Sequence, residues 1–404
     1  MKLLVQEYLE THSLGDLVRD HGVYASFSKS GHKWSLNYDQ IEAKEADPLS
    51  QECRGLILSL TDGQSVCVDR ETSVIGPTRV IAYPMKRFFN NGQGSAAEIN
   101  WHDPNLAILE KLDGTLCIVY WDPWFDRWCV ATRSVPEADL LMDNGLFTFR
   151  TLFEKALMET NGMSFDHFTS DLLKGYTYCF ELTTPYNRIV VYYPKPTITL
   201  LAVRSHVAER NYPELDITYL EKKMRGVPLV QGHTYNTLDE LVNWVSSLNP
   251  LQHEGVVVRD SNFNRIKVKN ANYVALNKVR DRLATSERNI VELILAEKDD
   301  DVIPMLPEEI VKNLQKIKEG LQAAIRKYDD AYQATKAEAD AINPGDKKTF
   351  AILITKDKSL WHAPFFQMFD NKASNMKDFI MKNKKDGSWG DSFLDKILEL
   401  AKRA

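Results

Sequence analysis

The sequence predicts an α+β fold in two parts: a large domain of mainly antiparallel sheets with flanking helices, and an all-helical C-terminal domain. Up to about residue 280, short runs of β-branched and aromatic residues alternate with turn residues, a pattern typical of antiparallel strands. Beyond that point Glu, Lys, Ala, Leu and Ile recur at helical spacing and the strand pattern stops. We therefore expect one domain over residues 1–280 and a second over residues 281–404.

Individual elements of the first domain can be placed from local patterns. Two pairs of apolar runs flank the turn-forming segments DPWFDR and DSNFN, and each pair predicts a hairpin. Residues 138–160 carry apolar residues at helical spacing, and Thr237 and Glu240 form a capping box before another helix. The expected hairpins are LCIVYW (116–121) with WCVATR (128–133) and GVVVR (255–259) with RIKVK (265–269); further strands are YTYCFEL (176–182), RIVVYY (188–193) and TITLLAVR (197–204).

In the second domain, NPGD (343–346) interrupts the helical pattern. Residues 281–343 hold 9 basic and 14 acidic residues, whereas residues 344–385 hold 9 basic and 4 acidic ones. A basic face in the second half would attract the phosphates of a nucleic acid, although an ordinary solvated helix face is an equally good interpretation. The lysines concerned are Lys347, Lys348, Lys356, Lys358, Lys372, Lys377, Lys382, Lys384 and Lys385.

Composition excludes several classes of protein. The formal net charge is −6, so contact with nucleic acid must come from local basic patches. No run of 18 apolar residues is present, which predicts no membrane span. The cysteines form no CxxC pair and the histidines no HExxH motif, so a disulfide framework, a thiolate zinc site and a His-rich metal site are disfavoured. The simplest interpretation is a cytoplasmic protein with reduced cysteines.

The sharpest local motif is Lys111-Leu112-Asp113-Gly114. A neutral lysine amine can attack the α-phosphorus of a nucleoside triphosphate and form a phosphoramidate, and nearby cations or desolvation favour the neutral amine. On an extended chain Asp113 would share a face with Lys111 and could orient the amine or the nucleotide. Gly114 would let the backbone approach a ligand closely. By itself, however, K-x-D-G is also typical of an ordinary surface turn.

Further blocks accompany this motif in a fixed order along the chain. Lys267 and Lys269 alternate with apolar residues, so on a strand both ammonium groups face one side, where they would suit a triphosphate. Glu181 and Glu254 would supply carboxylates for metal ions or ribose hydroxyls. The blocks are ECRG (52–55) and PMKRFFN (84–90) upstream, and CFEL (179–182), TPYNRIV (184–190), HEGVV (253–257) and IKVK (266–269) downstream.

In this order the blocks resemble those of the covalent nucleotidyltransferases, which comprise ATP-dependent ligases and mRNA capping enzymes. In particular the sequence is similar to the phage RNA ligase 1 family, which seals broken tRNA. The resemblance covers most of residues 45–280 and extends more weakly into the tail. It implies that residues 1–280 form a nucleotidyltransferase (adenylylation) domain. A helical tail separates this branch from DNA ligases and capping enzymes, which carry an OB-fold at that place and would show short alternating strands.

The resemblance also implies roles for matching residues. Lys111 would be the nucleophile that becomes lysyl-AMP, and Glu181 and Glu254 would serve the ribose and a Mg²⁺ or Mn²⁺ ion. Lys267 and Lys269 would bind the α-phosphate and the pyrophosphate that leaves. The remaining nucleotide-binding residues would be Arg54, Arg87, Asp113 and Gly114, and Phe89, Arg133 and Tyr273 would contact RNA or assist.

Some positions depart from the family pattern. Arg87 stands where family members have Lys; it keeps the charge for phosphate binding but could not replace a lysine that acts as a general acid. Arg133 matches a family Lys or Arg only with a one-residue gap. Asp300 and Asp301 resemble an acidic pair that would hold water on a metal ion, although an acidic helix end is at least as good an interpretation.

The implied reaction has three steps: ATP adenylylates Lys111, the AMP passes to the 5′-phosphate of an RNA strand, and a 3′-hydroxyl attacks the adenylylated end. The implied substrate is RNA with 5′-phosphate and 3′-hydroxyl ends, such as a cleaved tRNA anticodon loop, and the implied enzyme is a monomer in the host cytoplasm. Three alternatives stay open. They are a DNA ligase, a GTP-dependent capping-type nucleotidyltransferase, and a binding protein with a decayed domain.

Overall fold

The computed structural model describes residues 2–404 except 41, 63–73, 143–144, 207–212, 216–223, 225, 298, 300–302, 304–305 and 385–387. The chain divides into two units, Met1–Val274 and Ala275–Ala404. The end of the strand pattern predicts a boundary at residue 280, six residues beyond this division. Helix α8 (Ala271–Thr285) runs through both positions. The two units are described separately below.

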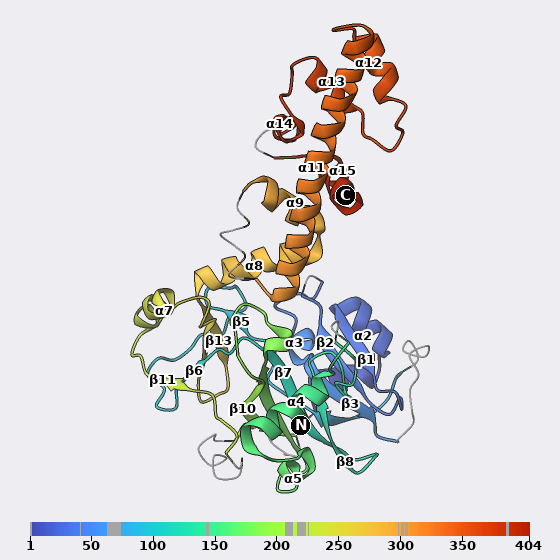
Figure 1. The fold of residues 1–404 in the computed structure, drawn as a ribbon. Helices are drawn as coiled ribbons and strands as arrows, with labels where there is room; N and C mark the ends of the chain where they lie inside the picture. Colours follow the sequence, from blue (N-terminus) through green and yellow to red (C-terminus); the bar gives the residue numbers. More distant parts are fainter. Residues whose placement is uncertain are drawn as a thin grey trace. The chain divides into compact units, whose positions relative to one another are not determined.

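Three sheets form the frame of the first unit (Figure 1). All neighbouring strands are antiparallel except β13 and β5, which pair in parallel. This confirms the α+β class and both predicted hairpins. In sheet order, the strands are β1 (Val23–Phe27), β2 (Trp34–Tyr38), β3 (Arg54–Leu60) and β4 (Thr78–Ala82); β10 (Thr197–Ser205), β9 (Tyr176–Thr183), β7 (Thr115–Asp122) and β8 (Arg127–Ala131); and β11 (Gly232–His233), β6 (Ala107–Glu110), β12 (Gly255–Arg259), β13 (Arg265–Lys269) and β5 (Phe89–Asn90).

Strand β7 is apolar on both faces because it lies between two cores. Cys117 and Val119 pack with helix α4 (Phe149–Asn161) in one cluster. Ile118 and Tyr120, on the opposite face, pack in a second cluster with Ile57 of β3. The alternation of strand side chains thus joins the first two sheets face to face and covers the outer face of the second sheet with α4.

The third sheet has one apolar and one polar face. Val256 and Val258 of β12 and Ile266 and Val268 of β13 pack against helix α7 (Leu238–Ser247). The residues between them on β13, which include Lys267, must face the other way. This polar face borders the candidate site described below.

The remaining helices of the first unit are short. Helices α1 and α2 cover the outer face of the first sheet through a cluster that contains Leu9, Leu17 and Trp34. Residues 185–187 form a single 3₁₀ turn (η2, Pro185–Asn187). The other helices are α1 (Leu4–Leu9), α2 (Leu14–His21), α3 (Pro48–Glu52) and α5 (Phe165–Thr169).

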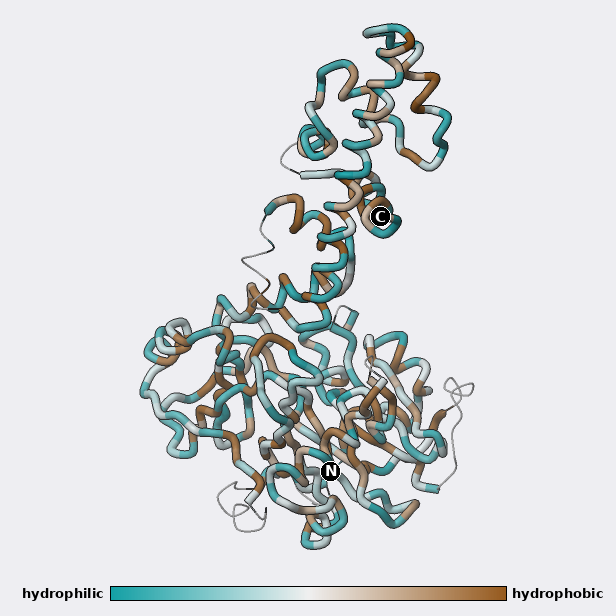
Figure 2. Tube along the Cα trace, in the orientation of Figure 1, coloured by the Kyte–Doolittle hydropathy of each residue, from teal (hydrophilic) through white to brown (hydrophobic). Residues whose placement is uncertain are grey.

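The second unit consists of helices around one apolar core. The long helix α11 (Glu308–Ile342) buries residues at spacings of three and four, among them Leu314, Ile317 and Leu321. Figure 2 shows apolar and polar segments alternating along this helix. Gly320 lets α15 approach closely, since a Cβ there would lie 2.1 Å from the carbonyl oxygen of Ala401. The further helices are α9 (Glu287–Leu295), α12 (Lys347–Ile354), α13 (Ala363–Phe369), α14 (Met376–Lys382) and α15 (Asp391–Arg403).

Two sequence predictions in the first unit are wrong. The helix predicted over 138–160 begins only at Phe149, because Ala138 and Gly145 adopt positive φ angles of 49° and 66° that interrupt a helix. The segment RIVVYY (188–193) forms no strand in the structure. Its backbone N–H groups at Val190 and Val191 donate instead to the carboxylate of Asp113.

Within the described residues, no helix is long and apolar enough to cross a membrane. Cys53, Cys117, Cys129 and Cys179 are buried free thiols, while Cys67 lies outside the described residues.

Candidate active site

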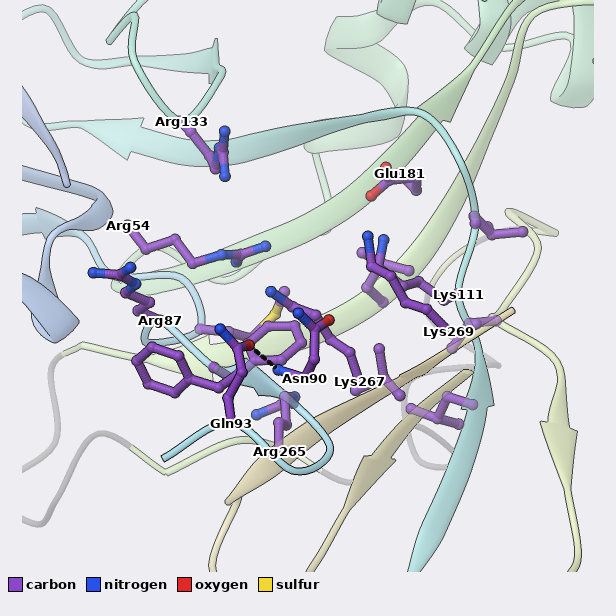
Figure 3. A pocket seen from close by; sticks show the side chains of 18 of the residues that line it. Arg54, Arg87, Asn90, Gln93, Lys111, Arg133, Glu181, Arg265, Lys267 and Lys269 are labelled. Carbon is purple, nitrogen blue, oxygen red and sulfur yellow. Dashed lines mark hydrogen bonds between the residues drawn. The ribbon is translucent and has the colours of Figure 1, made fainter. Parts of the chain in front are cut away.

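A cavity of about 450 Å³ in the first unit gathers most of the expected site residues. Its walls come from the end of β6, the polar face of β13, the start of β3, the middle of β9 and the segment 85–93. Figure 3 shows Arg54 reaching across the cavity toward Lys111 and Lys269. The expected residues that line it are Arg54, Arg87, Phe89, Lys111, Arg133, Glu181, Lys267 and Lys269.

Glu254 binds two of the lysines at once. Its Oε2 lies 2.6 Å from Lys111 Nζ and its Oε1 lies 2.7 Å from Lys269 Nζ. The backbone explains this arrangement, because Lys111 N–H donates to the carbonyl of Gly255 at the start of β12. Only glycine fits at Gly255, where φ is 141° and a Cβ would lie 2.2 Å from the Val268 carbonyl oxygen. The K-x-D-G lysine and the H-E-G glutamate are thereby held side by side across β6 and β12.

Lys267 shares the polar face of β13 with Lys269, as the alternating sequence predicts. Burial and, to a smaller extent, the nearby charges of Arg54, Lys111 and Lys269 together lower the pKa of Lys267 to about 7. Its Nζ lies 4.8 Å from the ring centroid of Phe88. The face therefore offers a cation that a bound polyanion would hold in its protonated form.

Arg54 has unused hydrogen-bonding capacity. Its Nη1 is buried and has no hydrogen-bond partner, and its guanidinium lies 5.1 Å from the ring centroid of Phe88. Burial and the charge of Arg133 lower the pKa of Arg54. Asn90 Oδ1, also on the cavity wall, is a second buried polar atom without a partner. Because buried polar groups are normally hydrogen-bonded, these two atoms indicate a polar ligand.

Glu181 projects from β9 beside the lysines. Its Oε1 accepts a hydrogen bond of 3.1 Å from the backbone N–H of Gly114. Its pKa is raised to about 7, mainly because it is buried and also because Glu254 is near, although Lys111 and Arg54 act in the opposite direction. A Cβ at Gly114 would lie 2.4 Å from the Leu182 carbonyl oxygen, so this close approach of β7 to β9 requires glycine.

Two arginines and two aromatic rings also line the cavity. The Arg87 guanidinium lies 4.2 Å from the ring centroid of Tyr38 and 5.1 Å from that of Phe89. Arg133 lies 6.0 Å from the same Tyr38 ring. Sequence reasoning missed Tyr38, because WSLNY resembles any half-buried strand and its proximity to Arg87 arises only from pairing of distant segments. It also missed Asn90, Gln93 and Arg265, which line the cavity.

Asp113 and Tyr273 are hydrogen-bonded to each other, and neither is among the residues that line the cavity. Asp113 is 4% exposed, and its Oδ2 accepts N–H groups of Val190 and Val191, each at 2.8 Å. Its Oδ1 accepts the Tyr273 hydroxyl at 2.6 Å. The expectation that Asp113 shares a face with Lys111 is wrong, because β6 ends at Glu110 and residues 111–113 are not extended strand. Asp113 instead fastens the loop that follows η2.

The carboxylates expected at a metal site are only partly described. Glu181 lines the cavity and Glu254 pairs with two of its lysines, whereas Asp300 and Asp301 fall outside the described residues. Asp299, next to them in sequence, pairs with Lys318 at 2.5 Å. Asp122, Cys129 and Glu137 also form a metal-like cluster. That cluster already holds the fully buried ammonium of Lys33, which pairs with Asp122 and lies 3.1 Å from Glu137.

The basic segment of the second unit is partly neutralised. Four of its lysines pair with carboxylates: Lys347 and Lys372 with Asp370, Lys377 with Glu297, and Lys382 with Asp378. Lys384 lies 4.7 Å from the Trp389 ring centroid, and Lys385 is outside the described residues. In the part of the chain that the structure describes, four of these lysines are exposed and have no ion pair: Lys348, Lys356, Lys358 and Lys384.

Comparison with known proteins gives consistent matches. An RNA ligase of Rhodothermus phage RM378 is 26% identical over 384 residues, which cover 80% of this chain and 82% of that protein. A protein of Autographa californica nuclear polyhedrosis virus, named a bifunctional polynucleotide kinase/RNA ligase, is 26% identical over 308 residues; the match spans 73% of this chain but only 39% of the viral protein. Among solved structures, an archaeal ATP-dependent RNA ligase aligns with a TM-score of 0.42 at 16% identity, covering 72% of this chain and 68% of that one.

Residues 52–273, more than half of the chain, match the RNA ligase family. The match begins at Glu52 of the ECRG block and ends at Tyr273, so it contains every expected site residue except Asp300 and Asp301. The chain belongs to the phage RNA ligase 1 family.

Proposed function

We propose that the protein is an ATP-dependent RNA ligase that joins 5′-phosphate and 3′-hydroxyl RNA ends through a lysyl-AMP intermediate on Lys111. The observation that carries the proposal is the position of the Lys111 amine. It lies 2.6 Å from Glu254 and lines a cavity together with Arg54, Lys267 and Lys269. A nucleophilic amine among cations is the arrangement that nucleotidyl transfer from a polyphosphate needs.

In the first step Lys111 Nζ would attack the α-phosphorus of ATP, and the bond between that phosphorus and pyrophosphate would break. The amine must be neutral to attack, and Glu254 Oε2 is the acceptor within hydrogen-bond distance for its proton. Arg54 Nη1, which lacks a partner, would donate to a phosphate oxygen. Most of the rate enhancement would come from positioning and from stabilising charge on the phosphates.

Lys267 and Lys269 would bind the phosphates of ATP and the pyrophosphate that leaves. Because the pKa of Lys267 is lowered to about 7, polyphosphate binding would draw a proton onto this lysine and release of the product would let it go. This residue thereby links occupancy of the cavity to proton uptake.

Glu181 and Glu254 also fit a divalent cation of the Mg²⁺ type, which is commonly held by one or two carboxylates together with substrate phosphates. Such an ion, Mg²⁺ or Mn²⁺, would neutralise phosphate charge during transfer.

In the second step the AMP would pass from Lys111 to the 5′-phosphate of an RNA strand. In the third step a 3′-hydroxyl would attack the adenylylated end, form the phosphodiester and release AMP. We propose that the enzyme acts as a monomer in repair of broken RNA, such as a tRNA cleaved in its anticodon loop. Family membership supports this assignment.

The test is incubation with ATP labelled at the α-phosphate and Mg²⁺, without RNA, followed by denaturing electrophoresis. Lys111→Ala is compared with Lys195→Ala, whose lysine is exposed and lies outside the cavity. We expect acid-labile label on the wild type and on Lys195→Ala but none on Lys111→Ala. Absence of label on wild type free of bound AMP would overturn the proposal.

Two further arms separate the alternatives. Labelled GTP is offered in place of ATP, and 5′-phosphorylated RNA and DNA strands are offered as acceptors. Label from GTP would assign capping-type chemistry, and joining of DNA but not of RNA would assign a DNA ligase. We expect label from ATP and joining of RNA.

A further inference from the structure

We infer that a second chamber beside Lys111 receives the 5′-phosphorylated end of the RNA, and that the rings of Phe147 and Tyr186 outside it stack a base of the same strand. This inference rests on the proposed function. It assigns the substrate end to a space that adjoins the nucleotide cavity.

The second chamber has a volume of about 360 Å³ and meets the nucleotide cavity at Lys111. The two spaces share Arg54, Arg133 and Glu181 as well. An RNA phosphate must reach the AMP while AMP is still attached to Lys111, so it needs space that the nucleotide does not fill. The second chamber is such a space, and the same lysine borders both.

The walls that belong only to the second chamber suit a phosphate ester and a sugar. Thr115, Thr132 and Ser134 bring hydroxyl groups to it, and Phe149 brings an aromatic ring. Together with the guanidinium groups of Arg54 and Arg133, these groups offer donors for phosphate oxygens and ribose hydroxyls. Arg54 Nη1 is the buried donor that still lacks a partner.

An aromatic surface continues from the wall of this chamber. Asn187 Nδ2 donates to Thr115 Oγ1 at 3.0 Å and thereby fastens the η2 turn to the chamber wall. Tyr186, the preceding residue, is 42% exposed, and its ring centroid lies 4.8 Å from that of Phe147. Phe147 is two residues before Phe149 in the chain. Tyr186 is therefore connected to the chamber wall through the neighbouring Asn187, and Phe147 through the nearby Phe149.

A cation and a third ring, which is exposed, follow Tyr186 closely in the chain. The Arg188 guanidinium lies 5.7 Å from the ring centroid of Tyr192, which is 58% exposed. Proteins bind single-stranded nucleic acid by combining exposed aromatic rings, on which bases stack, with cations near the backbone. An RNA strand whose end occupies the chamber would leave it over such a surface.

The step that this site would serve is the second transfer. An oxygen of the RNA 5′-phosphate forms a bond to the phosphorus of the lysyl-AMP while the bond from that phosphorus to Lys111 Nζ breaks. The lysine nitrogen leaves with the electron pair and takes up a proton. The product is RNA carrying a 5′–5′ diphosphate link to adenosine, and no other reactant is required.

The test separates the two transfers. Isolated enzyme–AMP is mixed with increasing 5′-phosphorylated oligoribonucleotide, and loss of label from the protein is followed in single turnovers. Tyr186→Ala removes an exposed ring. Ser134→Ala removes the hydroxyl of an exposed residue, which accepts a hydrogen bond of 3.2 Å from Asn37 Nδ2, so neither variant creates a cavity in a core. The matched control is Phe125→Ala, which removes a ring that is 46% exposed on the turn between β7 and β8.

For Tyr186→Ala we expect self-adenylylation at the wild-type rate and an increase of about 10-fold or more in the RNA concentration for half-maximal transfer, the effect of losing one stacked base. Ser134→Ala should raise that concentration also, whereas Phe125→Ala should leave it unchanged. The inference is overturned if both variants transfer AMP to RNA like the wild type. It is overturned equally if self-adenylylation falls in parallel with transfer, because the chamber would then hold the nucleotide. Failure of the wild type to form enzyme–AMP would instead refute the proposed function.

Discussion

At Gly114 the close packing of β7 against β9 directly affects the geometry of the candidate active site. A Cβ at this position would lie 2.4 Å from the carbonyl oxygen of Leu182 and 3.2 Å from Cγ of Glu181. Separations below 3.0 Å are essentially never seen for real Cβ atoms, and the nearer atom belongs to backbone. In Gly114→Ala, therefore, β7 and β9 must move apart where Thr115 pairs with Leu182.

The size of the effect follows from this geometry. Overpacking of a well-packed interior destabilises the folded state by about 1–3 kcal/mol. Replacing glycine by alanine also restricts the unfolded chain, which stabilises the folded state by up to about 1 kcal/mol. We expect the free energy of unfolding to fall by about 1–2 kcal/mol. The hydrogen bond from Gly114 N–H to Glu181 would also lengthen from 3.1 Å. Because Lys111 is three residues away, a displacement approaching 1 Å would slow self-adenylylation by about 100-fold.

The assay compares Gly114→Ala with Gly94→Ala by urea unfolding and by single-turnover self-adenylylation. Gly94 is a matched control, because a Cβ there would have nothing within 4 Å. Gly94→Ala should change neither quantity measurably. If Gly114→Ala were as stable and as fast as Gly94→Ala, the close approach of β7 to β9 would not matter for the site and the reasoning would be refuted.

Two further predictions concern the charged groups. The pKa of Lys267 is lowered to about 7, so the side chain loses its positive charge as the pH rises above that value. The affinity for pyrophosphate should therefore fall between about pH 7 and 9. In Lys267→Arg the affinity should depend less on pH, because arginine stays charged. Isothermal titration calorimetry measures both profiles, and equal slopes would contradict the role of Lys267. In the second unit, Lys348, Lys356 and Lys358 are exposed without ion pairs; reversing all three charges should weaken RNA binding in a filter assay more than self-adenylylation, and equal losses would count against RNA docking.

Local patterns predicted much of the β-rich unit correctly, and the failures share a cause. The hairpins of residues 116–133 and 255–269 form because apolar alternation and turn residues lie next to each other in the chain. The segment 188–193 has the same apolar character but forms no strand, because its N–H groups donate to Asp113, about 77 residues earlier. Strand propensity describes a side chain's fit to a sheet and says nothing of a distant carboxylate that competes for the backbone.

In the candidate site, too, local patterns placed some residues correctly, whereas residues positioned by distant contacts could not be placed. Lys267 and Lys269 could be placed on one face from alternation alone, since successive strand residues point to opposite sides. Asp113 could not be placed, because its orientation depends on where β6 ends and on Tyr273, which arrives from the start of α8. Tyr38 could not be found, because its ring meets Arg87 and Arg133 only after three separate segments pack.

By itself the sequence determined the residue types of the site, their order and the division into a β-rich and a helical part. These follow from covalent neighbours, since side-chain period and turn chemistry act over a few residues. Only the tertiary structure decided that Glu254 binds Lys111 and Lys269 together, that Arg54 keeps a buried donor without a partner, and that a second chamber opens beside Lys111. Distances between atoms far apart in the chain depend on strand pairing and core packing, which no local pattern encodes.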